Sequence, residues 1–191
     1  DGTRLRSEIT DKVQDLFGAP LSLEQLGQLL DSLEQVSALD NPRTRGYLYS
    51  LEARPAAHAG SAYPEEPEAL ARFLDQLLDS SDSGPDFDSN AYLIPHIDLR
   101  RGQESYAFAW NHLRSQLKHF DRFVILGISH AYSQKPFVLT RLNFETPLGK
   151  VETDRKAVEQ LASTLSFDPF TDEFNHLGEH SIEFQLIFLQ H

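Results

Sequence analysis

The sequence predicts an α/β fold with a mostly parallel sheet and flanking helices, preceded by a small helical module. Short apolar runs of strand length alternate with amphipathic helical stripes over most of the chain, which predicts the α/β part. Two of these runs are followed within a few residues by a histidine. Two further helical stripes open the chain and predict the module. With 191 residues, the chain has room for one sizeable core and a small appended unit.

The opening module contains two predicted helices. Apolar residues recur at helical spacing over 5–17, and the pattern stops at Gly18, a residue typical of helix C-caps. Ser22, followed three residues later by Gln25, resembles a capping box. An apolar stripe after this box predicts a second helix that runs to about Ser37.

The join between the two parts is predicted from turn residues. Residues 39–42 carry a turn signal, and an extended linker is expected from there to Pro55. We therefore expect a helical module at 1–50 and an α/β domain at 54–191.

The α/β domain is predicted to open with a βαβ unit. An amphipathic helix is expected over 70–78 and a polar surface loop over 80–90. The apolar runs at 91–94 and 123–126 predict strands, with a helical stripe over 106–117 between them. Strands in such units are normally parallel and buried, and ligands bind outside their carboxyl ends.

The remaining elements are predicted in chain order. Residues 137–140 form a further strand candidate, and 145–151 is expected to be a turn that enters an edge strand. Helical spacing then returns at 158–165 and again at 179–189.

Three histidines occupy positions where function is expected. His96 and His130 follow the two strands of the predicted βαβ unit, and His180 stands at the start of the last predicted helix. Neutral imidazole is a common ligand for zinc, copper and iron, and it titrates near neutral pH. The chain has no cysteine, so a metal ion would be held by nitrogen and oxygen alone. These positions predict a metal or acid-base site.

Two carboxylates lie near these histidines. Asp98 either adds a carboxylate to the site, with a catalytic role, or caps the helix that follows. Glu183 comes three residues after His180 and shares its face of the helix if that helix begins near Glu179. It is expected to orient a ligating histidine or to face solvent.

The other histidines are given minor roles. His176 precedes His180 by four residues, as in a helical metal pair, but Gly178 between them argues against a continuous helix. Four more are expected at the surface: His58, His112, His119 and His191.

Composition excludes several partners. The formal net charge of -12 argues against nucleic acid, because phosphate binding depends on clustered Lys and Arg. No apolar run approaches the roughly 20 residues that cross a bilayer, and no signal peptide opens the chain. We expect a cytoplasmic protein without membrane partners. The chain contains no methionine, so we expect it to differ from the complete translated product.

Five motifs, in this order and at these intervals, resemble the Memo family, which in bacteria is also called AmmeMemoRadiSam system protein B. The motifs are Ala59-Gly60-Ser61-Ala62-Tyr63-Pro64, Pro95-His96, Gly127-Ile128-Ser129-His130, Thr146-Pro147-Leu148-Gly149 and Glu179-His180-Ser181-Ile182-Glu183. The resemblance covers residues 54–191 and implies a fold similar to class III extradiol dioxygenases. It also implies that the C-terminal part of the family domain is not present here, because family members continue beyond the last motif.

The resemblance further implies a metal site. His96, His130 and His180 match the first, second and third family histidines, and the family is associated with iron or copper. This chain departs from the family after the first histidine, where it has Ile97-Asp98-Leu99-Arg100-Arg101-Gly102. Asp98 would add a carboxylate there, and either arginine would attract an anionic substrate.

The N-terminal residues resemble the later part of a PqqD-like winged-helix module, which implies a winged-helix-like fold for this part. Such modules hold peptide segments for partner enzymes, so a radical SAM partner protein or a peptide is expected. A simple packing or docking module explains the same two helices. A sheet edge where the family would continue also raises the expectation of a homo-oligomer.

Two functional hypotheses follow. In the first, the chain is a metal-dependent redox enzyme or metal-handling protein, with His96, His130 and a carboxylate on the ion and His180 as ligand or catalytic acid-base group. In the second, it is a non-catalytic module that binds a peptide or protein.

Overall fold

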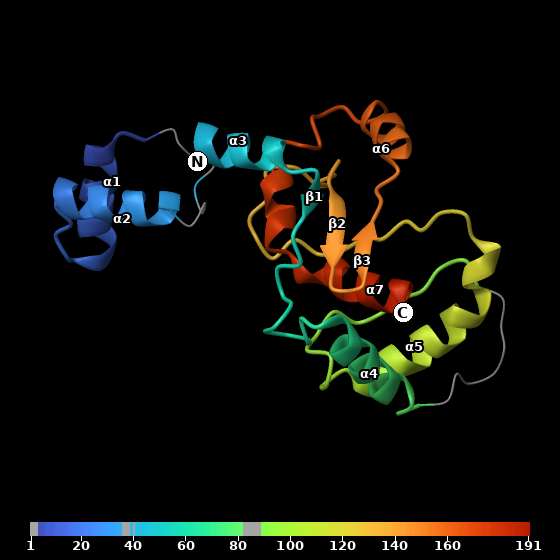
Figure 1. Ribbon diagram of the computed structural model, residues 1–191. Helices are drawn as coiled ribbons and strands as arrows, with labels where there is room; N and C mark the ends of the chain where they lie inside the picture. The colour runs from blue at the N-terminus through green and yellow to red at the C-terminus, as the bar shows by residue number, and fades with distance from the viewer. Residues whose placement is uncertain (1–3, 36–38, 40, 82–88) are drawn as a thin grey trace. The chain divides into compact units, whose positions relative to one another are not determined.

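The computed structural model describes residues 4–35, 39, 41–81 and 89–191. The chain divides into two compact units, Asp1–Ser50 and Leu51–His191. Within the described residues there are seven α-helices and one three-stranded sheet (Figure 1). No helix in these ranges has the length and apolar character needed to cross a membrane.

The first unit begins with the two predicted helices. Helix α1 (Arg6–Phe17) ends at Gly18, whose left-handed φ of 66° lets its N–H bond back to the helix. Helix α2 (Leu23–Gln35) begins with the predicted capping box. The Ser22 N–H donates to Gln25 Oε1 at 2.9 Å, and the Gln25 N–H donates to Ser22 Oγ at 3.1 Å. Both predicted helices are confirmed, and the predicted end near Ser37 lies outside the described residues.

Helix α3 (Pro42–Ser50) occupies most of the predicted extended linker, so that prediction was wrong. The turn signal is the start of this helix. Asn41 Oδ1 accepts the backbone N–H groups of Arg43 and Thr44, both at 2.9 Å, and proline fits the first helical position that follows.

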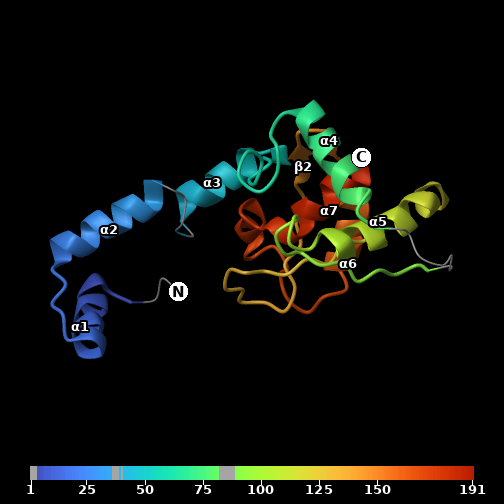
Figure 2. The ribbon, with the colours of Figure 1, turned by 90° about the horizontal axis from the view of Figure 1, so that it is seen from below.

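The core of the second unit lies among three helices. These are α4 (Pro67–Leu78), α5 (Gln103–Gln116) and α7 (His180–Gln190), and all three confirm predicted helices. Helix α7 runs between the small sheet and the α4 and α5 pair (Figures 1 and 2). Phe188 stacks between Tyr106 and Trp110, with ring centroids 5.3 Å and 5.5 Å away. Further buried members are Leu70, Leu74, Leu77, Leu113, Phe184 and Ile187.

The sheet is small and mixed rather than mostly parallel. Strand β1 (Ala53–Arg54) pairs parallel with β2 (Asn143–Thr146), and β2 pairs antiparallel with β3 (Gly149–Val151). The strand order β1-β2-β3 makes β3 an edge strand that follows a turn, as predicted. Gly149 has a φ of 122°, which favours glycine there.

Helix α6 (Arg155–Ala162) follows the hairpin. Asp154 caps it by accepting the Ala157 N–H at 2.9 Å. Two short 3-10 helices complete the unit, η1 (Leu117–His119) after α5 and η2 (Glu173–Leu177) before α7.

Three predicted strands are absent. Residues 91–94, 123–126 and 137–140 contain no assigned strand, and Figure 2 shows the corresponding segments as coil. A strand depends on a neighbour for its backbone hydrogen bonds, and no described strand pairs with these segments. Burial was also expected, yet Leu93, Val124 and Leu126 are exposed. The predicted loop at 80–90 falls largely outside the described residues.

The stacked core gives a stability prediction. Phe188 is 1% exposed, so Phe188→Ala should lower the free energy of unfolding by about 3–5 kcal/mol. Phe137 is 59% exposed, and Phe137→Ala should change the free energy of unfolding by about 0.5 kcal/mol or less. Urea denaturation followed by fluorescence of the chain's one tryptophan, Trp110, would measure both. Equal losses in the two variants would contradict this core.

Candidate metal centre

The structure brings the three predicted histidines together. His96, His130 and His180 each offer a ring nitrogen, and these nitrogens all lie within 4.8 Å of one another. The ring centroids are 5.3 Å apart for His96 and His130, 5.6 Å for His96 and His180, and 4.7 Å for His130 and His180. The prediction that these residues share one place in the fold is therefore confirmed.

His180 is positioned by the start of α7. It is the first helical residue, and the preceding Glu179 caps the helix by accepting the Ser181 N–H at 2.8 Å. A carboxylate at this position satisfies a free helix N–H and interacts favourably with the helix dipole. The helix start thus fixes the backbone from which the His180 ring projects.

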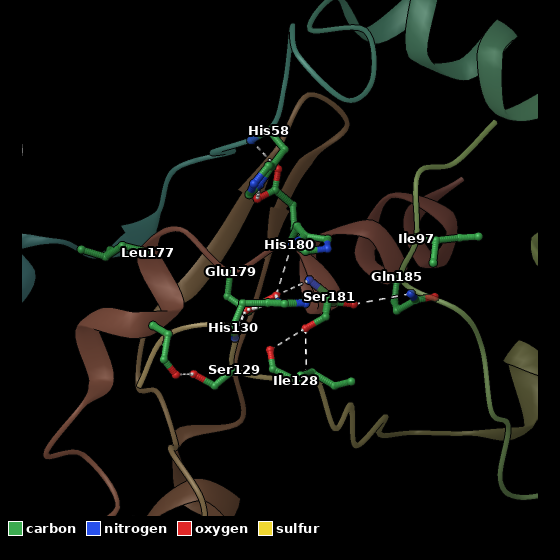
Figure 3. A network of polar contacts seen from close by, with 12 residues as sticks. His58, Ile97, Ile128, Ser129, His130, Leu177, Glu179, His180, Ser181 and Gln185 are labelled. Atoms are coloured by element: carbon green, nitrogen blue, oxygen red, sulfur yellow. Dashed lines mark hydrogen bonds and ion pairs between the residues drawn. The ribbon is translucent and has the colours of Figure 1, made fainter. Parts of the chain in front are cut away.

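His130 is held by the same carboxylate. Its backbone N–H donates to Glu179 Oε2 at 3.0 Å, and its ring Nδ1 lies 3.0 Å from the same oxygen (Figure 3). Burial alone would raise the pKa of Glu179, but the hydrogen bonds from His130 and Ser181 outweigh it and lower the pKa to about 2. An ionised Glu179 accepts a hydrogen bond from Nδ1–H, and in that tautomer of the neutral ring Nε2 of His130 carries the lone pair.

Two more α7 side chains hold the segments that carry His96 and His130. Ser181 Oγ accepts the Ile128 N–H at 3.0 Å and donates to the Ile128 carbonyl at 3.1 Å. Gln185 Nε2 donates to the Pro95 carbonyl at 3.1 Å. Gly127 is required for this close approach, because a Cβ there would lie 2.6 Å from Ser181 Oγ. Helix α7 therefore fixes both segments without β pairing.

The histidine cluster favours the neutral form of its central ring. Burial lowers the pKa of His180, and the neighbouring rings of His130, His58 and His96 lower it further against the opposing charge of Glu179. Neutral imidazole is the form that binds a metal ion. His96 and His180 are half-buried and His130 is exposed, so the cluster is open to solvent on one side.

Asp98 lies outside this cluster of ring nitrogens. Its Oδ1 accepts the backbone N–H groups of Arg100 at 3.1 Å and Arg101 at 2.9 Å, as a turn cap does. The capping alternative is therefore observed, and a catalytic role for Asp98 stays a prediction.

His58 is the residue that the sequence prediction missed. It was expected at the surface, but its ring lies 5.6 Å from that of His180 and its Nδ1 lies 3.1 Å from Glu183 Oε2. Glu183 is fully buried, so the solvent-facing alternative was wrong, and its role in orienting a ligating histidine stays a prediction. The signal in the sequence was the position of His58 directly before the motif that starts at Ala59.

The other histidines are settled by their contacts. His112 was expected at the surface but is buried on α5, where Gln116 lies 3.0 Å from its ring nitrogen. His119 is exposed, as predicted, and His191 is half-buried beside Asp75. His176 lies in η2 rather than in a helix continuous with α7, which confirms the argument from Gly178.

His176 gives a pH prediction. Burial lowers its pKa, and its Nε2 bonds the Val138 carbonyl at 3.1 Å. A depressed histidine pKa means that unfolding takes up a proton, so stability is complete above the unfolded pKa of about 6.5 and falls as pH drops below it. His176→Gln should therefore show a smaller loss of stability than the wild type between pH 7 and pH 5 in urea denaturation.

The exposed His119 supplies the control for this measurement. His119→Gln should keep the pH dependence of the wild type. An unchanged slope in His176→Gln would show that the His176 ring is protonated equally in the folded and unfolded states.

A comparison with known proteins identifies the family to which the motifs belong. A family model described as Memo-like protein matches residues 54–191. A MEMO1 family protein of Aquifex aeolicus (strain VF5) is 32% identical over 201 residues, which cover 100% of this chain and 52% of that protein. No solved structure matches the chain.

Two further relatives extend the comparison. A MEMO1 family protein of Thermus thermophilus is 26% identical and covers 98% of this chain and 58% of that protein. The protein memo-1 homolog of Caenorhabditis elegans is 36% identical and covers 74% of this chain and 39% of that protein. The chain thus spans about half the length of the curated relatives it matches. The likenesses to PqqD-like modules and to extradiol dioxygenases stay predictions. The family model, which matches more than half of the chain, shows that this chain belongs to the Memo-like family.

Proposed function

We propose that the Memo-like region binds iron or copper through His96, His130 and His180, and that the protein is a metal-dependent redox enzyme or a metal-handling protein. The observation that carries this proposal is the convergence of three ring nitrogens within 4.8 Å. The three residues come from separate parts of the chain, and packing of apolar side chains does not require them to meet.

The donor set fits a first-row transition metal. Imidazole nitrogen suits iron, copper and zinc, whereas magnesium and calcium prefer oxygen ligands. Glu179 orients His130 as outer carboxylates orient metal-binding histidines. Three protein ligands on a side open to solvent leave room for a further ligand, as in catalytic rather than purely structural sites.

The residues of this chain would hold the ion and prepare the site. Bound iron or copper would supply Lewis acidity and one-electron chemistry. Glu179 keeps Nε2 of His130 available, and burial keeps His180 neutral. The exposed edge of His130 gives a small molecule access to the same place.

Metal content tests the proposal directly. The full chain, loaded anaerobically with Fe(II) or with Cu(II) and dialysed, should retain metal in near-stoichiometric amount by mass spectrometry. His96→Ala, His130→Ala and His180→Ala should each lose most of it, because each removes one of three ligands. His119→Ala, which changes an exposed histidine outside the cluster, should retain it.

If the wild-type protein retains no more metal than the three histidine variants, the proposal is wrong. That result would favour the alternative prediction, a non-catalytic module that binds a peptide or protein.

A second test addresses orientation rather than ligation. Glu179→Gln removes the carboxylate that fixes the His130 ring, so metal affinity should fall about 10-fold to 100-fold. Glu52→Gln is the matched control, since the Glu52 side chain forms an exposed ion pair with Lys150 and should leave affinity unchanged when altered. Competition with a chromophoric chelator would measure the metal affinity of both variants. Equal affinities in Glu179→Gln and Glu52→Gln would show that Glu179 does not support metal binding.

A further inference from the structure

His58 is held from two directions by one carboxylate. Its backbone N–H donates to Glu183 Oε1 at 2.9 Å, and its ring Nδ1 lies 3.1 Å from Glu183 Oε2. Backbone and ring are therefore both fixed, which leaves the imidazole little freedom to turn. Among the described residues none forms a hydrogen bond with the other ring nitrogen, Nε2.

Glu183 is itself fixed in a fully buried position. Arg54 Nη2 lies 2.6 Å from its Oε2, and the Tyr63 hydroxyl donates to its Oε1. Arg54 is buried on β1 and also donates to the Glu179 carbonyl at 2.7 Å. The desolvation free energy of a buried ion pair is about as large as the attraction between its charges, so this pair contributes little net stability. Fixing the orientation of His58 is a second effect of the same contacts.

These contacts determine the tautomer of His58. Burial alone would raise the pKa of Glu183, but Tyr63, Arg54 and His58 together lower it, so Glu183 is ionised. An ionised carboxylate only accepts, and the proton of the neutral His58 ring is therefore on Nδ1. Nε2 then carries a lone pair and accepts a hydrogen bond.

The His58 ring lies beside the histidine cluster, with its centroid 5.6 Å from that of His180. Figure 3 shows His180 between His58 and His130. The His58 and His180 side chains are exposed to similar extents, 26% and 28%. His58 is not among the three residues whose nitrogens lie within 4.8 Å of one another.

We propose that His58 is a binding residue for the molecule that occupies the three-histidine centre, and that its Nε2 accepts a hydrogen bond from an N–H or O–H group of that molecule. The ligand class is a small molecule with one atom that binds the metal ion and a separate protic group. Arg54, Glu183 and Tyr63 act as positioning residues for His58. This inference rests on the proposed metal site.

The test compares two small ligands that differ in one donor. Zn(II), which histidine nitrogens also bind, is loaded into the full chain. Imidazole and 1-methylimidazole are then titrated in, because bound imidazole presents an N–H group and 1-methylimidazole does not. The ratio of their affinities, followed by NMR of the 15N-labelled histidines, should be about five-fold to ten-fold larger in wild type than in His58→Ala. His58→Gln, which restores an acceptor, should lie between them.

The outcomes separate the two claims. Zn(II) that binds wild type and His58→Ala equally, with the imidazole preference lost only in the variant, supports the inference. If wild type and His58→Ala prefer imidazole over 1-methylimidazole to the same extent, the inference is overturned and the proposed function is unaffected. If a folded His58→Ala variant no longer binds Zn(II), His58 is itself a metal ligand, and the inference is overturned. Wild type that binds no Zn(II), Fe(II) or Cu(II) overturns the proposed function and this inference together. His119→Ala should behave as wild type throughout.

Discussion

The second unit depends on the polar side chains at the start of α7. Glu179 bonds to His130, and Ser181 bonds to the Ile128 backbone. Glu183 bonds to His58, and Gln185 bonds to the Pro95 carbonyl, next to His96. Alternate residues of an α-helix point about 200° apart, so these side chains reach segments on different sides of the axis. One helix end thus collects three segments that are distant in sequence, and His180 lies among them.

These hydrogen bonds position segments that neighbouring strands would position in a larger sheet. The segments around 91–98 and 123–130 have no strand partner among the described residues, so their positions depend on side-chain hydrogen bonds to α7. Buried polar groups are costly when unpaired, and each of these side chains is paired with a specific backbone or ring atom. The apolar half of α7 packs against α4 and α5, which holds the polar end in place. Packing at one end of the helix therefore determines histidine geometry at the other.

The sequence was informative for several elements whose determining interactions are local, although helix α3 was missed despite its local Asn41 cap. Helical periodicity, the Ser22 and Gln25 capping box and the Gly18 C-cap depend on residues within one or two turns, and all were predicted. Apolar runs at 91–94 and 123–126 predicted strands that the structure lacks, because strand formation depends on partners elsewhere in the chain. His58 was missed for a related reason: its determining partner, Glu183, lies 125 residues away. The three clustered histidines were found from the motif resemblance and from the helix start at His180, although the strands predicted before His96 and His130 are not observed.

The claim that unites fold and site is that α7 gathers these histidines around one metal ion. Anomalous diffraction from crystals of the iron- or copper-loaded protein, collected on both sides of the metal edge, tests it most directly. We predict one strong anomalous peak within bonding distance of ring nitrogens of His96, His130 and His180. A loaded crystal with its peak elsewhere, or with none at these nitrogens, would contradict the account.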